Sequence, residues 1–78
     1  MSKVYWNYDT AYDDTNSIRF SSMKGCDRET FESVVAKFVS AYGYRITEKR
    51  EIIKLVNGTY SCFITLKGRE DVLFENPQ

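Results

Sequence analysis

Apolar residues between Phe31 and Tyr42 recur at spacings of three and four, which is the period of one face of an α-helix. The stripe consists of Phe31, Val34, Val35, Phe38, Val39 and Tyr42. Asp27 stands before it at the N-cap position, where a carboxylate accepts hydrogen bonds from the first turn. Gly43 follows as the expected left-handed residue that ends a helix. The pattern therefore predicts one amphipathic helix over about 28–42.

Two segments before this helix alternate between apolar and polar residues, with the period of a half-buried strand. They are residues 3–8 and 17–21, and the residues between them are rich in turn formers and carboxylates. The side chains expected to face the core are Val4, Trp6, Tyr8, Ile18 and Phe20. We predict a β-hairpin with a long acidic tip over 9–16, and whether that tip is ordered in isolation stays open.

The dipeptide Asn57-Gly58 favours a second hairpin, with strands over 52–56 and 59–66. A two-residue turn pairs Leu55 with Tyr60 and Ile53 with Cys62 on the inward face. On the outward face it pairs Val56 with Thr59, Lys54 with Ser61, and Ile52 with Phe63. The competing interpretation is a short second helix within 47–56, which we disfavour because this segment contains several β-branched residues.

A turn at 67–70 is expected to lead to a last strand over 71–75, through Val72, Leu73 and Phe74, and residues 76–78 are expected to form a disordered tail. The predicted fold is α+β: a single helix packed on an antiparallel sheet, in the order ββαβββ. A chain of 78 residues accommodates one hydrophobic core, so we expect a single domain over 1–78.

Eleven Lys and Arg balance eleven Asp and Glu, so no net charge attracts nucleic acid or an anionic membrane. No stretch has the length and apolarity of a signal sequence core or a membrane span. The two cysteines, Cys26 and Cys62, are far apart, as is usual in a reducing compartment. These features predict a cytoplasmic protein without a membrane partner.

Catalytic equipment is sparse. The chain has no His, which removes the commonest general base and metal ligand. Cys26 is the better candidate nucleophile because it precedes a helix N-terminus, but Asp27 beside it opposes a thiolate. The four glycines are isolated at element boundaries and form no phosphate-binding loop. We predict a protein that is not an enzyme and holds no cofactor and no metal.

The hairpin tip carries the one carboxylate cluster that invites a functional interpretation, Asp9, Asp13 and Asp14, and Tyr5, Tyr8 and Tyr12 lie close to it in sequence. Its spacing does not match a calcium-binding loop, although oxygen ligands for Ca²⁺ remain an alternative, as does a merely solvated tip. Tyrosine supplies large contact area at low entropic cost. The predicted partner-binding residues are Tyr5, Tyr8, Asp9, Tyr12, Asp13 and Asp14.

A second constellation lies on the outward face of the second hairpin, where basic residues surround an aromatic ring. Single-stranded nucleic acid is bound in this way, by stacking and phosphate contacts. The residues predicted for this alternative are Arg50, Lys54, Phe63 and Lys67.

We therefore expect a small protein-binding module, an inhibitor or adaptor acting through the acidic loop. In general character it resembles phage or mobile-element accessory proteins that cover a host enzyme's surface, although no shared motif carries this resemblance. A nucleic-acid-binding domain is the first alternative, and a homodimer with pairing sheet edges is the second.

Overall fold

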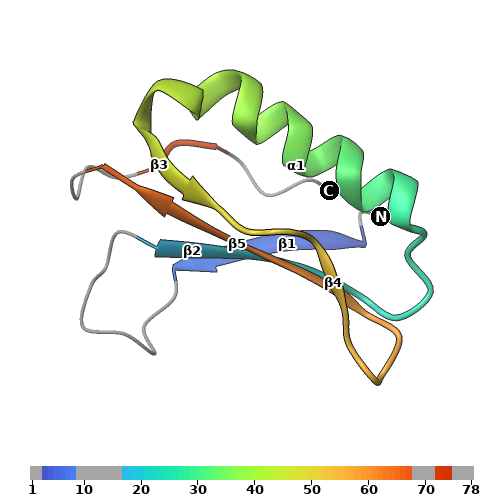
Figure 1. The fold of residues 1–78 in the computed structure, drawn as a ribbon. Coiled ribbons are helices and arrows are strands. Elements are labelled where there is room, and N and C mark those ends of the chain that lie inside the picture. The colour runs from blue at the N-terminus through green and yellow to red at the C-terminus, as the bar shows by residue number, and fades with distance from the viewer. Residues whose placement is uncertain (1–2, 9–16, 68–71, 75–78) are drawn as a thin grey trace.

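One α-helix lies across one face of a five-stranded antiparallel sheet (Figure 1) in this computed structural model, which describes residues 3–8, 17–67 and 72–74. The elements are β1 (Val4–Tyr8), β2 (Ser17–Ser22), α1 (Arg28–Tyr42), the 3₁₀ turn η1 (Gly43–Arg45), β3 (Ile46–Lys49), β4 (Ile53–Lys54) and β5 (Tyr60–Leu66). The predicted α+β class and the order ββαβββ are confirmed.

The helix begins and ends where the sequence pattern places it. The backbone N–H of Thr30 donates to Oδ1 of Asp27 at 2.8 Å, so the predicted N-cap is confirmed. Phe31, Val35 and Phe38 are buried, and the other three residues of the stripe pack against the same core. The stripe meets buried side chains of the sheet, chiefly Val4, Trp6, Ile18, Phe20, Cys62, Ile64 and Leu66.

The prediction for Gly43 is wrong. Its φ of −53° and ψ of −34° are right-handed helical values, and the chain continues through η1 instead of turning into the left-handed region. The backbone N–H of Ile46 donates to the Gly43 carbonyl and closes this last turn. The helix thus ends by tightening, which requires no glycine.

Strand β5 pairs with β2, β3 and β4. The strand order is β1-β2-β5-β3, and β4 pairs with another part of β5. The predicted first hairpin is confirmed: β1 and β2 are antiparallel, with Trp6 opposite Phe20 in the core. Its predicted acidic tip, 9–16, lies outside the described residues.

The second hairpin exists, but its predicted register is wrong by one residue. Ile53 pairs with Ser61 and Lys54 with Tyr60. The reason is the turn: Gly58 N–H donates to the Leu55 carbonyl at 2.9 Å, and Gly58 has a φ of +86°. A turn followed by a left-handed glycine makes a three-residue loop, and a one-residue shift moves every side chain of β4 to the other face.

A strand that the sequence did not indicate, β3, precedes this hairpin. It pairs with β5 through an irregularity at Thr47, and its four residues are mostly exposed. The alternative of a second helix within 47–56 is also wrong, because β3 and β4 occupy half of this segment and none of its residues is helical.

The predicted strand over 71–75 is wrong for its described part, residues 72–74, which form no strand. Side chains hold this segment instead. Nε1 of Trp6 donates to the Phe74 carbonyl at 3.0 Å, and the hydroxyls of Tyr8 and Tyr42 accept hydrogen bonds from the N–H groups of Val72 and Leu73. Val72 and Phe74 consequently pack with the core although their segment forms no hydrogen bonds of a β-sheet.

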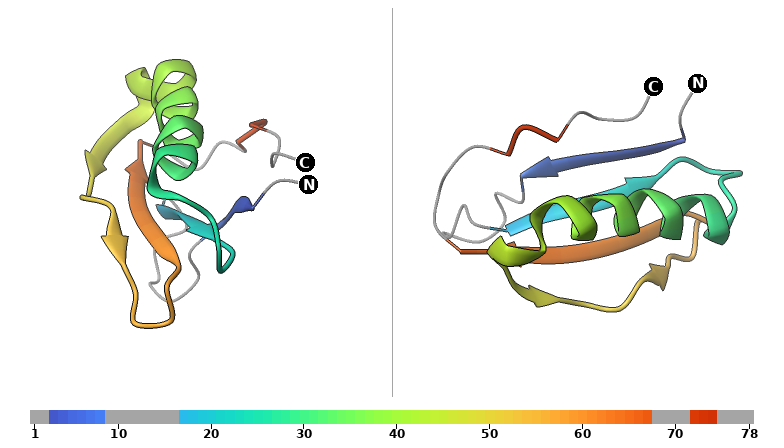
Figure 2. Two further views of the ribbon diagram at one scale, coloured as in Figure 1. Left: turned by 90° about the vertical axis from the view of Figure 1, so that its right-hand side faces the viewer. Right: turned by 90° about the horizontal axis from the view of Figure 1, so that it is seen from above.

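Seen from the side and from above, α1 covers one face of the sheet only (Figure 2). None of the elements over 3–8, 17–67 and 72–74 covers the opposite face, which we call the outer face.

Candidate binding surface on the outer face of the sheet

The outer face is organised as rows of side chains that run across the strands, because directly paired residues share a face. The middle row is Asn7, Arg19, Phe63 and Arg50. The row on one side is Tyr5, Ser21, Ser61 and Ile53, and the row on the other is Ser17, Thr65 and Glu48.

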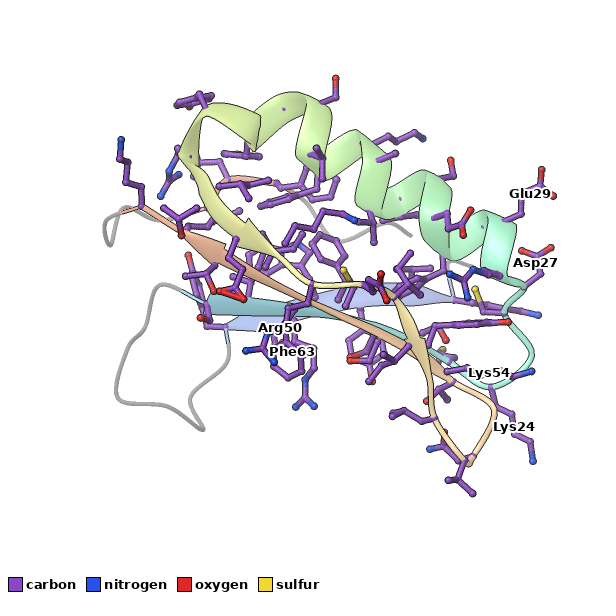
Figure 3. The ribbon with its side chains drawn as sticks, in the orientation of Figure 1. Lys24, Asp27, Glu29, Arg50, Lys54 and Phe63 are labelled. Atoms are coloured by element: carbon purple, nitrogen blue, oxygen red, sulfur yellow. The ribbon has the colours of Figure 1, made fainter. Side chains whose placement is uncertain are left out.

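Phe63 is the centre of the middle row, with Arg19 of β2 on one side and Arg50, which directly follows β3, on the other. The guanidinium carbon of Arg19 lies 5.4 Å from the centre of the Phe63 ring, within the range of a cation–π contact. On the other side, the backbone N–H of Arg50 donates to the Phe63 carbonyl at 3.0 Å. The side chains of Arg50 and Phe63 both point away from α1 (Figure 3).

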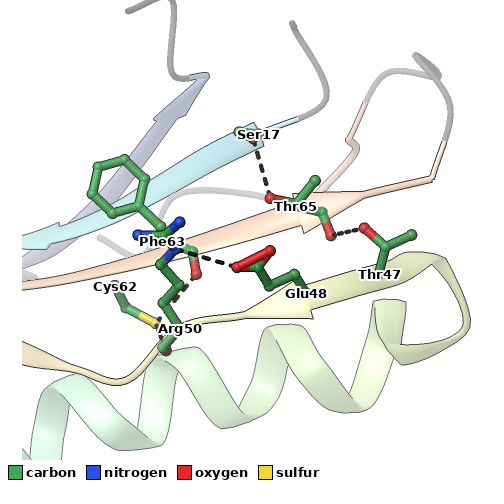
Figure 4. Close-up of polar contacts among 7 residues, drawn as sticks. All are labelled: Ser17, Thr47, Glu48, Arg50, Cys62, Phe63 and Thr65. Carbon is green, nitrogen blue, oxygen red and sulfur yellow. Dashed lines mark hydrogen bonds and ion pairs between the residues drawn. The ribbon is translucent and has the colours of Figure 1, made fainter. Parts of the chain in front are cut away.

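The side chain of Arg50 is only weakly fixed by its ion pair with Glu48. Its Nε lies 3.3 Å from Oε2 of Glu48 (Figure 4), and both side chains are more than half exposed. An ion pair of this kind contributes about 0–1 kcal/mol in solvent. Arg50 can therefore exchange Glu48 for another anion at little cost.

The neighbouring row places small residues between two exposed apolar ones. Tyr5 is 42% exposed and Ile53 49% exposed, while Ser21 and Ser61 lie between them. Ser61 is buried, and its Oγ has no hydrogen-bond partner among the described residues. An unpaired buried hydroxyl costs about 1–3 kcal/mol, so it is an unusual feature for a strand centre.

Ser61 lines a hollow of about 450 Å³ beside the middle row. The other lining residues are Lys49, Arg50, Glu51, Ile53 and Phe63. Two of these residues are cations and one is a carboxylate, while Ile53 and Phe63 supply apolar wall. Because the exposed ion pair of Arg50 with Glu48 can be exchanged, the hollow can receive a small anionic group next to an apolar one.

A second hollow, of about 730 Å³, lies between α1 and the segment joining β3 to β4. Its apolar lining includes Val35, Val39 and Ile52, and its charged lining consists of Arg28, Glu32, Lys49 and Glu51. Arg28 and Glu32 pair with each other at 2.7 Å. Two cations and two carboxylates give this hollow no net charge, so it has no preference for the charge of a ligand.

The predicted partner-binding residues fall in three places. Tyr5 lies on the outer face, but Tyr8 lies on the opposite face of β1, where its hydroxyl accepts the hydrogen bond from Val72. Asp9, Tyr12, Asp13 and Asp14 lie outside the described residues. Strand alternation thus separates Tyr5 from Tyr8, and neither is shown to act with the acidic tip.

Of the residues predicted for nucleic acid, the structure brings Arg50 and Phe63 together on the outer face. Lys54 is on the other face, because the shifted register sets it opposite Tyr60, whose ring centre is 5.8 Å from its Nζ. Lys67 follows β5, four residues or about 13 Å beyond Phe63. Sequence reasoning missed Arg19, since only the pairing of β2 with β5 places it beside Phe63.

Neither cysteine has the surroundings of an activated nucleophile. Burial and the neighbouring carboxylate of Asp27 both raise the pKa of the Cys26 thiol. Burial also raises the pKa of the Cys62 thiol, whose Sγ donates to the Arg50 carbonyl. Both thiols are free, and each occupies the core as a small apolar group.

Within 3–8, 17–67 and 72–74, no group of three or more His, Cys, Asp or Glu side chains is placed to hold a metal ion. The Ca²⁺ alternative concerns the tip over 9–16, which lies outside these ranges. No helix in the described part of the chain has the length and apolarity needed to cross a membrane.

Comparison of the chain with protein-family models, with curated proteins and with solved structures finds no match. The case for a function therefore depends on the residues of the outer face.

Proposed function

We propose that this chain is a small non-enzymatic protein-binding module that contacts its partner with the outer face of the sheet. The observation that supports this most is Phe63, which is half-buried at the centre of an uncovered sheet face, between Arg19 and Arg50. Exposed Tyr5 and Ile53 extend the apolar part of this face. Aromatic residues and arginine are the types enriched at the centres of protein interfaces.

A protein partner suits this face better than nucleic acid for two reasons. Arg19 covers part of the Phe63 ring, so a base has to displace it in order to stack. The chain also has no net charge, whereas affinity for phosphate backbones depends on an excess of cations.

An inhibitor or adaptor of phage or mobile-element type, acting on a host protein, is the particular form that we propose. Such a protein needs only a rigid surface of modest size, and one helix on an antiparallel sheet supplies it. The acidic tip over 9–16 is proposed as a second contact with the partner.

The test is capture of partners from the cells that naturally express the chain, with the wild type and Phe63→Ala as parallel baits. We expect Phe63→Ala to lose the proteins that the wild type retains. Tyr44→Ala is the matched control, because Tyr44 is an aromatic residue that is 79% exposed at the far end of α1. Equal capture by wild type and Phe63→Ala would refute the proposal.

Nucleic acid is the second candidate, and the Arg19–Phe63–Arg50 row is the observation in its favour. It demands binding of single-stranded oligonucleotides that weakens steeply with salt and falls when Phe63 becomes Ala. Absence of a gel shift at low salt would eliminate it.

Homodimerisation through sheet edges is the third candidate and has less support. The edge formed by β3 and β4 has an irregularity at Thr47 and charged residues at Glu48 and Lys49, features that discourage edge pairing. A mass that rises with concentration in sedimentation would favour the dimer.

A further inference from the structure

The hollow beside Ser61 combines three features that point to the chemistry of what enters it. Ser61 Oγ is buried without a hydrogen-bond partner among the described residues, although the residue lines the hollow. The cationic side chain of Arg50 lines the same hollow, and its present ion pair with Glu48 is solvent-exposed. Phe63 and Ile53 form an apolar wall.

The Ser61 hydroxyl can donate one hydrogen bond and accept others, and the Arg50 guanidinium has donors beyond the one directed at Glu48. A negatively charged acceptor is the group that can pair with both at once. Glu51 also lines the hollow and Glu48 pairs with Arg50 beside it, so an incoming carboxylate takes the place of Glu48 on Arg50. Phe63 and Ile53 require that apolar atoms accompany the anion.

We propose that this hollow receives an aspartate or glutamate side chain of the protein partner, hydrogen-bonded by Ser61 Oγ and Arg50, with an adjacent apolar residue against Phe63. This inference rests on the proposed function and specifies the partner as an acidic segment with interleaved apolar residues. The volume of about 450 Å³ is ample for one such side chain and its neighbour.

Ser61→Ala separates this role from a structural one. If the hydroxyl serves only the fold, removing it changes stability alone. Because it is unpaired, its removal should leave the melting temperature of the free protein unchanged or raised. Loss of binding together with equal or greater stability is the signature of a hydroxyl kept for a ligand.

The probe is a capped pentapeptide of alternating glutamate and phenylalanine, titrated at low salt into the isotope-labelled full chain, with amide chemical shifts as the readout. We expect shifts at Arg50, Ser61 and Phe63. A peptide with glutamine in place of glutamate should bind about tenfold more weakly, as befits loss of a charged hydrogen bond. Ser61→Ala should weaken the glutamate peptide to a similar extent.

Two matched controls accompany it. Ser21→Ala removes the neighbouring serine of the same row, which does not line the hollow, and should bind as the wild type does. Lys37→Gln removes one positive charge from α1 and should bind the glutamate peptide as the wild type does. Arg50→Gln removes an equal charge from the hollow and should weaken this binding strongly.

The inference is overturned if the glutamate peptide does not bind, if Ser61→Ala binds it unchanged, or if oligothymidylate produces the same shifts more tightly than the peptide. The proposed function fails separately. It is lost only if Phe63→Ala still captures the natural partner, whereas capture that is sensitive to Phe63 but not to Ser61 leaves it standing without the carboxylate pocket.

Discussion

Arg19 on β2 lies directly opposite Phe63 on β5, with its guanidinium carbon 5.4 Å from the ring centre. The contact holds an exposed charge in place over an aromatic ring on a face that no described element covers. At an exposed site such a contact contributes about 0.5–1 kcal/mol.

Arg19→Gln should therefore reduce the free energy of unfolding by no more than about 1 kcal/mol, while affinity for the protein partner falls and loses part of its salt dependence. Denaturant unfolding and titration at two salt concentrations measure the two effects. Lys37→Gln, which removes an equal charge from α1, is the control. Affinity that stays equal in Arg19→Gln would exclude this residue from the interface.

Phe38→Ala tests the core. Phe38 is fully buried, and its ring centre lies 5.2 Å from that of Phe20 and 5.3 Å from that of Phe74. Removing a buried phenylalanine side chain should cost about 3–5 kcal/mol, comparable to the whole stability of a small domain. A variant with an unshifted thermal unfolding curve would contradict the placement of this residue at the centre of the core.

Gly58 and Gly43 should respond in opposite directions to replacement by Ala. Gly58 has a φ of +86°, so Ala there should cost about 1–2 kcal/mol. Gly43 has helical angles and open space where a Cβ would lie, so Ala there should stabilise by about 0.4–1 kcal/mol. Chemical denaturation measures both changes in the free energy of unfolding. Destabilisation by Gly43→Ala would contradict the right-handed conformation of Gly43 and support a left-handed one.

The Asp27 cap should make stability depend on pH. Hydrogen bonds from Thr30 lower the pKa of the Asp27 carboxyl below that of the unfolded chain. Its contribution is therefore present above the unfolded pKa of about 3.9 and disappears as the pH falls through the folded value. Asp27→Ala should melt lower than wild type at neutral pH, with the gap closing in acid. Asp27→Asn is the control, because it keeps an N-cap acceptor without the charge. A difference in melting temperature between wild type and Asp27→Ala that does not change with pH would contradict the ionised cap.

Changing Asp9, Asp13 and Asp14 together to Asn tests the acidic tip. If the tip contacts the partner, affinity and its salt sensitivity should both fall while the melting temperature stays nearly constant. Equal affinity would restrict the interface to the outer face.

The helix could be predicted to the residue because local signals agree: the stripe, the Asp27 cap and the absence of interruptions all specify the same segment. The first hairpin followed from strict alternation in both strands. These elements depend on short-range properties that the sequence displays directly.

The second hairpin shows where such reasoning fails. Asn57-Gly58 suits both a two-residue and a three-residue loop, and the choice between them decides on which face Lys54 lies. Strand β3 was missed because its residues are mostly polar and exposed, so pairing with β5 rather than alternation defines it. Arg19 joined the candidate surface only through the pairing of β2 with β5, strands that are distant in sequence.

Amide chemical-shift mapping of the full chain with its purified natural partner tests the central claim most directly. We expect the largest changes on the outer face, at Arg19, Arg50, Ser61 and Phe63. Changes confined to α1 and the hollow along it, with the outer face unaffected, would contradict the claim.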